Sequence, residues 1–371
     1  MKFARLTRHL GLAVVAFVVV TACGSTSSGT ATCSTAKTAT SASACGGMDA
    51  LVAAAKAEGK LNVIALPRDW ANYGAILDGF TAKYGIAITS DNPDGSSQDE
   101  VNAVQQLGTT SRAPDVLDVG MAVALANLTL FAPYKVATWS DILDTQKEST
   151  GLWFQDYGGF MSIGYDSSKV PAITTMDDLL KSNYRGKVAL NGNPKQANAA
   201  LNGVMMANLA SGGTLDDISK GVDFFHRLKQ AGTFVPVQAT TATVKNGTTP
   251  VVFDWDYLSA AHGKDVPAWK VFVPSNAILG GYYAQAINKN APHPAAARLW
   301  EEYLYSDEGQ NLWLKGLARP VRQAAMEKSG KVDKTAAAAL PAVSGTPKFM
   351  SADQATAAKN YVVAHWDAAI S

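Results

Sequence analysis

Short apolar runs alternate with amphipathic stretches along most of the chain. The runs LNVIALP (61–67), IAITSD (86–91) and APDVLDVG (113–120) have the length and the bounding turn signals of buried strands. Two stretches with helical spacing, 70–85 and 98–108, lie between them, and each ends at a glycine. Strands that alternate with helices at this spacing predict a parallel sheet flanked by helices.

The carboxyl ends of these predicted strands carry polar residues, at 67–69, 94–97 and 118–120. In parallel sheets, ligands bind just beyond these ends. Ser97, with Glu100 three residues later, predicts a capping box at the start of the third helix.

A second α/β region follows the first. FMSIGYDSSKVP (160–171) predicts a strand that enters this region, which we bound at 158–279. GGYYAQAINKN (280–290) predicts a return to the first region, 48–157. Residues 280–371 then hold the return and the C-terminal helices. The pattern therefore predicts two α/β lobes that share a crossing segment.

Residues 1–22 have the layout of a secretory signal peptide. A basic start precedes the apolar segment 10–20, and small residues follow. The alternative is a transmembrane anchor, but the apolar segment is shorter than the roughly 20 residues that span a bilayer. Cys23 after small residues resembles the lipobox of bacterial lipoproteins. That resemblance implies that Cys23 is lipidated and anchors the protein outside the cytoplasmic membrane.

The segment 23–47 consists almost entirely of Ser, Thr, Ala and Gly. Such a composition buries too little apolar area to fold and predicts a flexible tether. The chain has three cysteines. With Cys23 lipidated, Cys33 and Cys45 remain as a possible disulfide or as two free thiols.

Composition narrows the classes of function. The 371 residues are enough for two lobes. The formal net charge is +1, and it becomes −2 without Lys2, Arg5 and Arg8 of the leader. This balance argues against a nucleic-acid partner, which needs a concentrated basic face. No phosphate loop, nucleophile elbow, HExxH or CxxC occurs. This absence does not exclude an enzyme, because acid and base pairs have no fixed spacing, but we expect no enzyme activity, no cofactor and no metal.

Several segments, in this order, resemble the bacterial extracellular solute-binding proteins of ABC importers, closest to the branch that binds polyamines, iron(III), thiamine and phosphonates. They are ALVAAAKAEGKLNVIALP (50–67), DWANYG (69–74), APDVLDVG (113–120), SIGYDSSKVP (162–171), VVFDWDYL (251–258) and GGYYAQAINKNAPHPAAARLWEEYLYSDEGQ (280–310). The resemblance implies a type II periplasmic-binding-protein fold, a two-lobed α/β protein whose lobes close on a ligand at the hinge. It also implies that the closed form docks on the permease subunits in the membrane.

The strongest candidate ligand contacts are Asp254, Trp255, Asp256 and Tyr257, which follow an apolar strand. Carboxylates bind an ammonium group by charge-assisted hydrogen bonds, and aromatic faces attract it. Asp256 is alternatively a helix N-cap, and Trp255 is alternatively core. Because Asp254 and Trp255 are adjacent, an extended backbone would point them to opposite faces.

Further candidate ligand contacts lie at the other predicted strand ends and at the return crossing. They are Trp70, Asn72, Tyr73, Ser96, Ser97, Asp118, Asn193, Tyr282 and Tyr283. The alternatives are helix capping for the two serines, a turn for Asp118 and Asn193, and core packing for Tyr73. Tyr282 and Tyr283 also match iron(III) receptors, but adjacent strand residues diverge and cannot easily ligate one ion.

These observations favour a monomeric, lipid-anchored receptor that delivers a small solute to an ABC importer. The acidic and aromatic residues favour an organic cation such as a polyamine. The stretch around Tyr282 offers no acid, however, whereas the polyamine-binding relatives have one there. A secreted hydrolase or lyase, or a lipoprotein that senses a ligand without transport, is the alternative.

Overall fold

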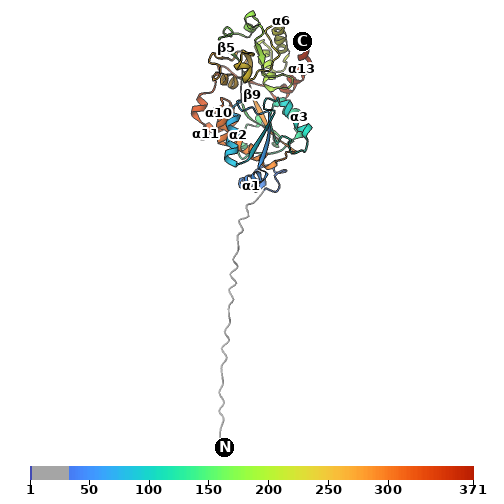
Figure 1. The fold of residues 1–371 in the computed structure, drawn as a ribbon, viewed down its shortest axis with the longest axis vertical. Coiled ribbons are helices and arrows are strands. Elements are labelled where there is room, and N and C mark those ends of the chain that lie inside the picture. The colour runs from blue at the N-terminus through green and yellow to red at the C-terminus, as the bar shows by residue number, and fades with distance from the viewer. Residues whose placement is uncertain (2–32) are drawn as a thin grey trace. The chain divides into compact units, whose positions relative to one another are not determined.

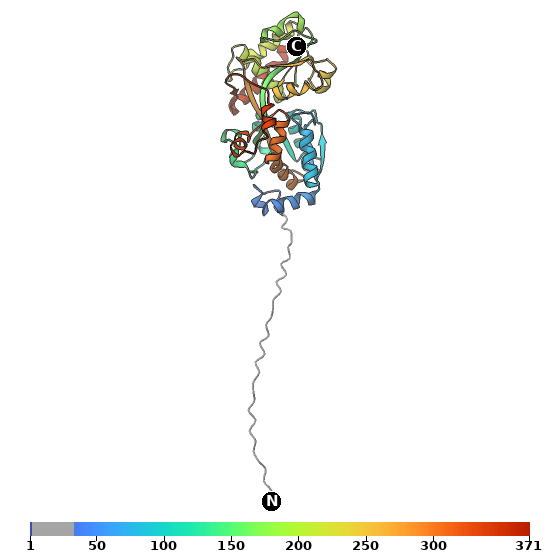
Figure 2. The ribbon, with the colours of Figure 1, turned by 90° about the vertical axis from the view of Figure 1, so that its left-hand side faces the viewer.

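The computed structural model describes Met1 and residues 33–371. The predicted signal peptide, Cys23 and the first part of the predicted tether lie outside these residues. In the described part, the elements gather into two α/β lobes, one blue to teal and one mostly green to yellow (Figures 1 and 2). No helix in residues 33–371 has the length and apolarity that a membrane span requires.

The first lobe, lobe 1, contains the alternating helices and strands expected from the apolar pattern. Its elements in the first part of the chain are α1 (Met48–Glu58), β1 (Lys60–Ile64), α2 (Tyr73–Tyr84), β2 (Ala87–Asp91), α3 (Ser97–Leu107), β3 (Val116–Gly120), α4 (Met121–Ala126) and β4 (Phe131–Ala132). Strands β1 and β2 are parallel, as predicted. Strand β3 instead pairs antiparallel with the returning strand β9 (Leu279–Asn288).

The second lobe, lobe 2, is built on the long strand β5 (Phe154–Asp166), which pairs antiparallel with two of its strands. The elements of this lobe are β6 (Val188–Leu190), α5 (Asn198–Ala210), α6 (Ser219–Gln230), α7 (Thr241–Lys245), β7 (Val251–Trp255), α8 (Asp256–His262) and β8 (Trp269–Phe272). Strand β6 lies parallel to β7. The carboxyl end of β7 therefore faces the same way as that of β6.

After β9 the chain returns to helices. They are α9 (Pro294–Leu304), α10 (Asp307–Lys315), α11 (Gln323–Ser329), α12 (Lys334–Ala338) and α13 (Ala352–Ile370), with the short strands β10 (Arg319–Pro320) and β11 (Lys348–Phe349) among them. Helices α9 and α1 pack together in lobe 1. Helix α13 packs on α6 and α5 of lobe 2 and also on α4 of lobe 1. Its buried Val362 and Trp366 are the apolar anchors of this contact.

Strands β5 and β9 run between the lobes side by side. Phe154 of β5 pairs with β9, whereas Met161 onward pairs with β7. The two backbones approach so closely here that a Cβ atom on Gly158 would lie 2.1 Å from the carbonyl oxygen of Gly281. Glycine is therefore required at this hinge position.

Residues 33–47, assigned above to a flexible tether, are folded against lobe 1. A disulfide joins Cys33 to Cys45. The carbonyl oxygens of Lys37 and Ala39 accept hydrogen bonds from the guanidinium of buried Arg298 on α9. Composition predicted a tether because it reflects neither the disulfide that closes this loop nor the contact with Arg298.

The capping box of α3 begins one residue earlier than predicted. Ser96 is the N-cap and exchanges hydrogen bonds with Asp99. Ser97 and Glu100 instead accept hydrogen bonds from the backbone amides of Gly120 and Asp118. These two side chains therefore join the start of α3 to the end of β3 in lobe 1.

Candidate ligand-binding site

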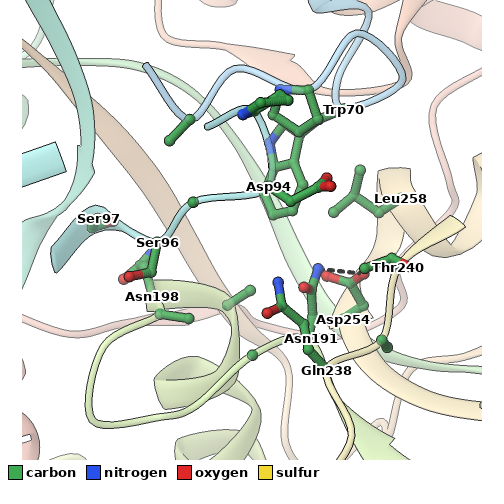
Figure 3. A pocket seen from close by; sticks show the side chains of 18 of the residues that line it. Trp70, Asp94, Ser96, Ser97, Asn191, Asn198, Gln238, Thr240, Asp254 and Leu258 are labelled. Atoms are coloured by element: carbon green, nitrogen blue, oxygen red, sulfur yellow. Dashed lines mark hydrogen bonds between the residues drawn. The ribbon is translucent and has the colours of Figure 1, made fainter. Parts of the chain in front are cut away.

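A cavity of about 190 Å³ lies at the strand ends and is lined from both lobes (Figure 3). Lobe 1 contributes residues from the segments 65–70 and 93–100, together with Asp118. Lobe 2 contributes the segments 191–199 and 238–241 and several residues near the end of β7. A pocket shared between two lobes exchanges solvent when the lobes separate and encloses its contents when they close.

Asp118, at the end of β3, forms the lobe 1 floor of the pocket. Its Oδ2 atom accepts hydrogen bonds from the hydroxyls of Tyr73 (2.6 Å) and Tyr157 (3.1 Å). Its Oδ1 atom is buried and has no hydrogen-bond partner. Burial raises the pKa of Asp118 to about 7, although the two tyrosine hydroxyls oppose the shift.

Trp70 is an aromatic residue of the pocket lining that is linked to Asp118 through Tyr157. Its indole Nε1 donates to the Tyr157 hydroxyl at 2.7 Å, which fixes the ring. The indole meets the ring of Tyr283 edge to face, with centroids 5.9 Å apart. Tyr157 and Tyr283 stack on each other at 5.6 Å. All three rings line the pocket.

Asp254 is the main acidic residue on the lobe 2 side. Asn191 donates its Nδ2 to Asp254 Oδ2 at 2.9 Å, the bond drawn in Figure 3. The backbone amide of Trp255 donates to Oδ1. Desolvation dominates over both hydrogen bonds and raises the pKa of Asp254 to about 7. Leu258 of α8 supplies an apolar contact beside it (Figure 3).

Neutral polar side chains form most of the remaining lobe 2 wall. They are Asn191, Asn193, Gln196, Asn198, Gln238, Thr240 and Thr241. The start of α5 also faces the pocket, because Ala197 to Ala199 line it. Ala197 is the N-cap and supplies no side-chain cap, so the first amides of this helix present a partial positive charge.

The lining is strongly acidic. Its carboxylates are Asp69, Asp94, Asp99, Glu100, Asp118 and Asp254, and it includes no Lys or Arg. Two basic side chains near the pocket in sequence point elsewhere: Arg68 pairs with Asp78, and Lys195 pairs with Asp367 of α13. In the described part of the chain, no cluster of His, Cys, Asp and Glu is arranged to hold a metal ion.

About half of the predicted contact residues lie together in this pocket. They are Trp70, Ser96, Ser97, Asp118, Asn193, Asp254 and Tyr283. They come from six separate segments of the chain, and Tyr283 lies within strand β9. Asp254 lines the pocket and Trp255 does not, as their opposite directions on β7 require.

The other predicted contacts lie outside the pocket. Trp255 and Tyr257 are completely buried, and their rings stack at 6.4 Å in the core behind the pocket. Asp256 pairs with Arg319 at 2.8 Å. The Trp255 indole donates to the Tyr283 hydroxyl, whereas the buried Tyr257 hydroxyl has no hydrogen-bond partner. Of the sequence FDWDY, only the first aspartate lines the cavity.

The remaining three predicted residues are also engaged elsewhere. Asn72 has a positive φ of 70° and donates its side-chain amide to the Leu312 carbonyl. Tyr73 is core, and it holds Asp118 through its hydroxyl. Tyr282 stacks on Phe349 at 6.4 Å. Asn72 therefore holds its loop to α10, Tyr73 positions Asp118, and Tyr282 packs on Phe349.

Sequence reasoning missed several lining residues: Tyr157, Gln196, Asn198, Gln238, Thr240 and Leu258. Tyr157 lies on a strand that carries no turn or motif signal. The neutral amides and hydroxyls occur in loops and helix starts, where such residues are common for local reasons. A signal was available for Asn198, since it begins a helix that follows a predicted strand.

Residues 110–342 match the family described as bacterial extracellular solute-binding protein. This match covers more than half of the chain, so the chain belongs to that family. The resemblance drawn from the sequence is thereby confirmed. No curated protein sequence matches the chain.

Many solved structures share the fold. Iron-bound HitA from Pseudomonas aeruginosa is 18% identical with a TM-score of 0.62, covering 84% of this chain and 99% of that one. A putative spermidine/putrescine ABC transporter protein from Listeria monocytogenes is 12% identical with a TM-score of 0.64, covering 83% and 99%. AfuA from Actinobacillus pleuropneumoniae, with fructose-6-phosphate bound, is 16% identical with a TM-score of 0.65, covering 84% and 98%. The chain therefore has the two-lobed, type II periplasmic-binding-protein fold.

Proposed function

We propose that this protein is the extracytoplasmic receptor of an ABC importer and that its solute is a small organic cation bearing ammonium groups, such as a polyamine. The observation that carries the solute class is the lining of the pocket, with six carboxylates and no Lys or Arg. None of these carboxylates forms an ion pair anywhere in residues 33–371. Burial raises the pKa values of Glu100, Asp118 and Asp254, so these carboxyls favour a cationic partner in the pocket.

The two buried carboxyls strengthen the argument. Asp118 and Asp254 are 7% and 3% exposed, so neither is well solvated by water. A buried carboxylate without a cation is costly. Each of these carboxyls therefore retains a proton up to near neutral pH in the free protein. A solute ammonium group would replace that proton and make a charge-assisted hydrogen bond. The ring of Trp70, which lines the pocket, would add cation–π attraction of about 0.5–2 kcal/mol.

One feature favours a solute that carries an anionic group as well. The uncapped start of α5 presents partial positive charge to the pocket, and solute phosphates and carboxylates bind such helix ends. That partial charge amounts to about half an elementary charge. Several carboxylates oppose it across the same small cavity. A purely anionic solute is therefore disfavoured, and a zwitterion such as an amino-phosphonate is the second candidate.

The importer and the lipid anchor belong to the same proposal. A receptor tethered by lipid at Cys23 stays at high local concentration beside its permease. Binding and lobe closure need no covalent chemistry, so the protein would act by population shift alone. Replacing Cys23 by Ala should release the protein from membranes, as fractionation would detect. Retention in the membrane fraction would contradict lipid anchoring.

A thermal-shift screen of the purified protein tests the solute class. The panel comprises putrescine, spermidine, thiamine, an amino-phosphonate, fructose-6-phosphate, iron(III) citrate, neutral sugars and amino acids. A tight ligand at a hundredfold excess over its dissociation constant stabilises by about 2.7 kcal/mol. We expect a clear shift with an amine and none with fructose-6-phosphate. A shift with anions alone would reject the cationic solute and keep the receptor role, whereas turnover of a panel compound would favour an enzyme.

A further inference from the structure

Residues 33–47, which precede α1, form a short folded segment that we call the clasp. The disulfide between Cys33 and Cys45 closes it. The buried side chains of the clasp are these two cysteines together with Ala36 and Ala39. Side chains this small bury little apolar area, so the hydrophobic effect alone holds the clasp only weakly on lobe 1. Polar contacts and the disulfide must therefore supply much of its attachment.

The main polar contact between the clasp and lobe 1 is the buried guanidinium of Arg298 on α9. Arg298 is 1% exposed. It donates to the carbonyl oxygens of Ala39 at 2.7 Å, of Lys37 at 3.0 Å and of Pro294 at 3.0 Å. The ring of Tyr134 lies 5.6 Å from the guanidinium carbon. Two of the three acceptors therefore belong to the clasp, and the third lies in α9 itself.

Arg298 differs from two other largely buried arginines. Arg319 and Arg322 each pair with a carboxylate. Within residues 33–371, no carboxylate lies within ion-pair distance of Arg298. Burial lowers the pKa of Arg298 to about 10, as expected for a cation that is removed from water without a bound anion. A desolvated cation of this kind depends on hydrogen-bond acceptors, and the clasp supplies most of them.

We propose that the clasp is a redox-dependent device: the disulfide between Cys33 and Cys45 keeps residues 33–47 on lobe 1, and Arg298 is the group of lobe 1 that depends on it. In the oxidised protein, Arg298 has all three carbonyl acceptors. In the reduced protein, the clasp detaches and becomes the flexible segment that its composition predicts, so Arg298 retains one acceptor. This inference goes beyond the proposed function and does not depend on the solute.

Thiol–disulfide exchange with a disulfide-bearing oxidant forms the bond. The thiolate of one cysteine attacks a sulfur atom of the oxidant, which gives a mixed disulfide and releases one thiol. The second cysteine then displaces the other thiol and forms the Sγ–Sγ bond. Two electrons pass to the oxidant, and its two new thiols take up the two protons that the cysteines lose. Because such conditions occur outside the cytoplasm, lobe 1 would be completed only after export.

Hydrogen exchange of the purified protein, measured by mass spectrometry over residues 33–47, tests whether the disulfide keeps the clasp attached. In the oxidised wild type, we expect protection of amides that are bonded within the clasp, such as those of Ala39 and Gly47. These amides should exchange at least about 30-fold faster in Cys33→Ser/Cys45→Ser and in the wild type reduced with dithiothreitol. Exchange within about threefold of the oxidised wild type would overturn the proposal.

Thermal unfolding tests whether Arg298 depends on the disulfide. Arg298→Met keeps an apolar stem and removes the charge. We expect it to lower the Tm of the oxidised protein by at least about 3 °C, because the carbonyls of the clasp lose their donor. In the Cys33→Ser/Cys45→Ser background it should lower the Tm by less than about 1 °C, or raise it, because the cation there lacks acceptors. Equal losses in both backgrounds would overturn the link between Arg298 and the clasp.

Arg322→Met is the matched control, because Arg322 is also buried but pairs with Asp141 and Asp307, outside the clasp. We expect it to lower the Tm equally in both backgrounds, to within about 1 °C. A dependence on the disulfide as large as that of Arg298→Met would indicate general weakening of the fold and overturn the proposal. If Arg298→Met does not fold, hydrogen exchange of the oxidised and reduced wild type still decides whether the disulfide holds the clasp.

Discussion

Asp254 and Asp256 are two residues apart, and both are buried, with 3% and 0% of their surface exposed. Asp254 faces the pocket and has no cation within ion-pair distance in the described structure. Asp256 faces the hinge, where Arg319 pairs with it and the amides of Phe160 and Tyr257 donate to its other oxygen. The protein therefore neutralises a buried charge at its hinge and leaves one unneutralised in its pocket.

This difference separates stability from function within one short segment. A buried carboxylate with an arginine and two amide donors is satisfied and holds elements together. A buried carboxylate without a cation costs stability, and that cost is recovered only when a ligand supplies the charge. Substitutions at the two positions should therefore have opposite consequences for the free protein.

The largest effect is expected at the hinge. Asp256→Ala would leave Arg319 largely buried without its partner and would free two backbone amides. Breaking a buried pair from one side costs about 3–5 kcal/mol. Urea unfolding should show this loss. The control Asp256→Asn/Arg319→Met removes both charges and should be less destabilised than Asp256→Ala; equal loss in both would show that the ion pair contributes nothing.

The next effect is expected in the pocket. Asp254→Asn removes the carboxylate and should weaken binding of the cationic solute by about 2 kcal/mol or more. Burial holds the pKa of Asp254 near 7, so the folded protein retains a proton that the unfolded chain releases between about pH 4 and 7. The unfolding free energy of the free protein therefore falls as the pH rises through that interval.

Asp254→Asn should remove the contribution of Asp254 to this pH dependence, leave that of Asp118, and stabilise the free protein above pH 7. We expect a net gain of about 1–2 kcal/mol at pH 8, because the amide also loses one acceptor for Asn191 or Trp255. Urea unfolding of the wild type and the variant at pH 5 and pH 8 measures both the pH dependence and the gain in stability. A variant that is less stable than the wild type at pH 8 would mean that Asp254 is a structural residue.

Sequence reasoning located the pocket because its elements follow general rules. Strand ends gather ligand contacts, and Asp254, Asp118 and Trp70, which were proposed from their positions, their chemistry and the family resemblance, line the pocket. The choice between Asp254 and Asp256 could not be made in this way. It depends on Arg319, which lies far along the chain and reaches the hinge only in the folded protein.

Residues 33–47 show a second limit of sequence reasoning. Their composition is that of a flexible linker, yet Arg298 requires acceptors and finds them in the carbonyls of this segment. Every residue has a backbone carbonyl, so the sequence does not show which carbonyls accept a hydrogen bond. Local composition therefore wrongly predicts a flexible tether for residues 33–47. The alternating strands and helices of lobe 1 were predictable because each carries its own apolar period.

A smaller effect is expected from pH on binding. Asp118 and Asp254 both have a pKa near 7 in the free protein, and a cation binds their ionised forms. Solute affinity should therefore rise with pH between about 6 and 8, by about tenfold or more, with release of protons. Titration in buffers of different ionisation enthalpy measures this release. Asp254→Asn should release fewer protons, and an affinity independent of pH would show that these carboxyls do not contact the solute.

The smallest effect is expected at the rim, and it decides whether the pocket is truly uncompensated. Arg68 and Lys195 are near the pocket in sequence, but each pairs with an exposed aspartate that points elsewhere. Because exposed pairs contribute little, Arg68→Ala and Lys195→Ala should each change solute affinity by less than about twofold. Isothermal titration at low and high salt distinguishes a contact from long-range attraction, since salt screens only the latter strongly. Tightening of the cation by about tenfold in Lys195→Ala at both salt concentrations would mean that Lys195 neutralises the pocket in solution. In that case the contrast between Asp254 and Asp256 would be one of degree, because both carboxylates would have a cationic partner within the protein.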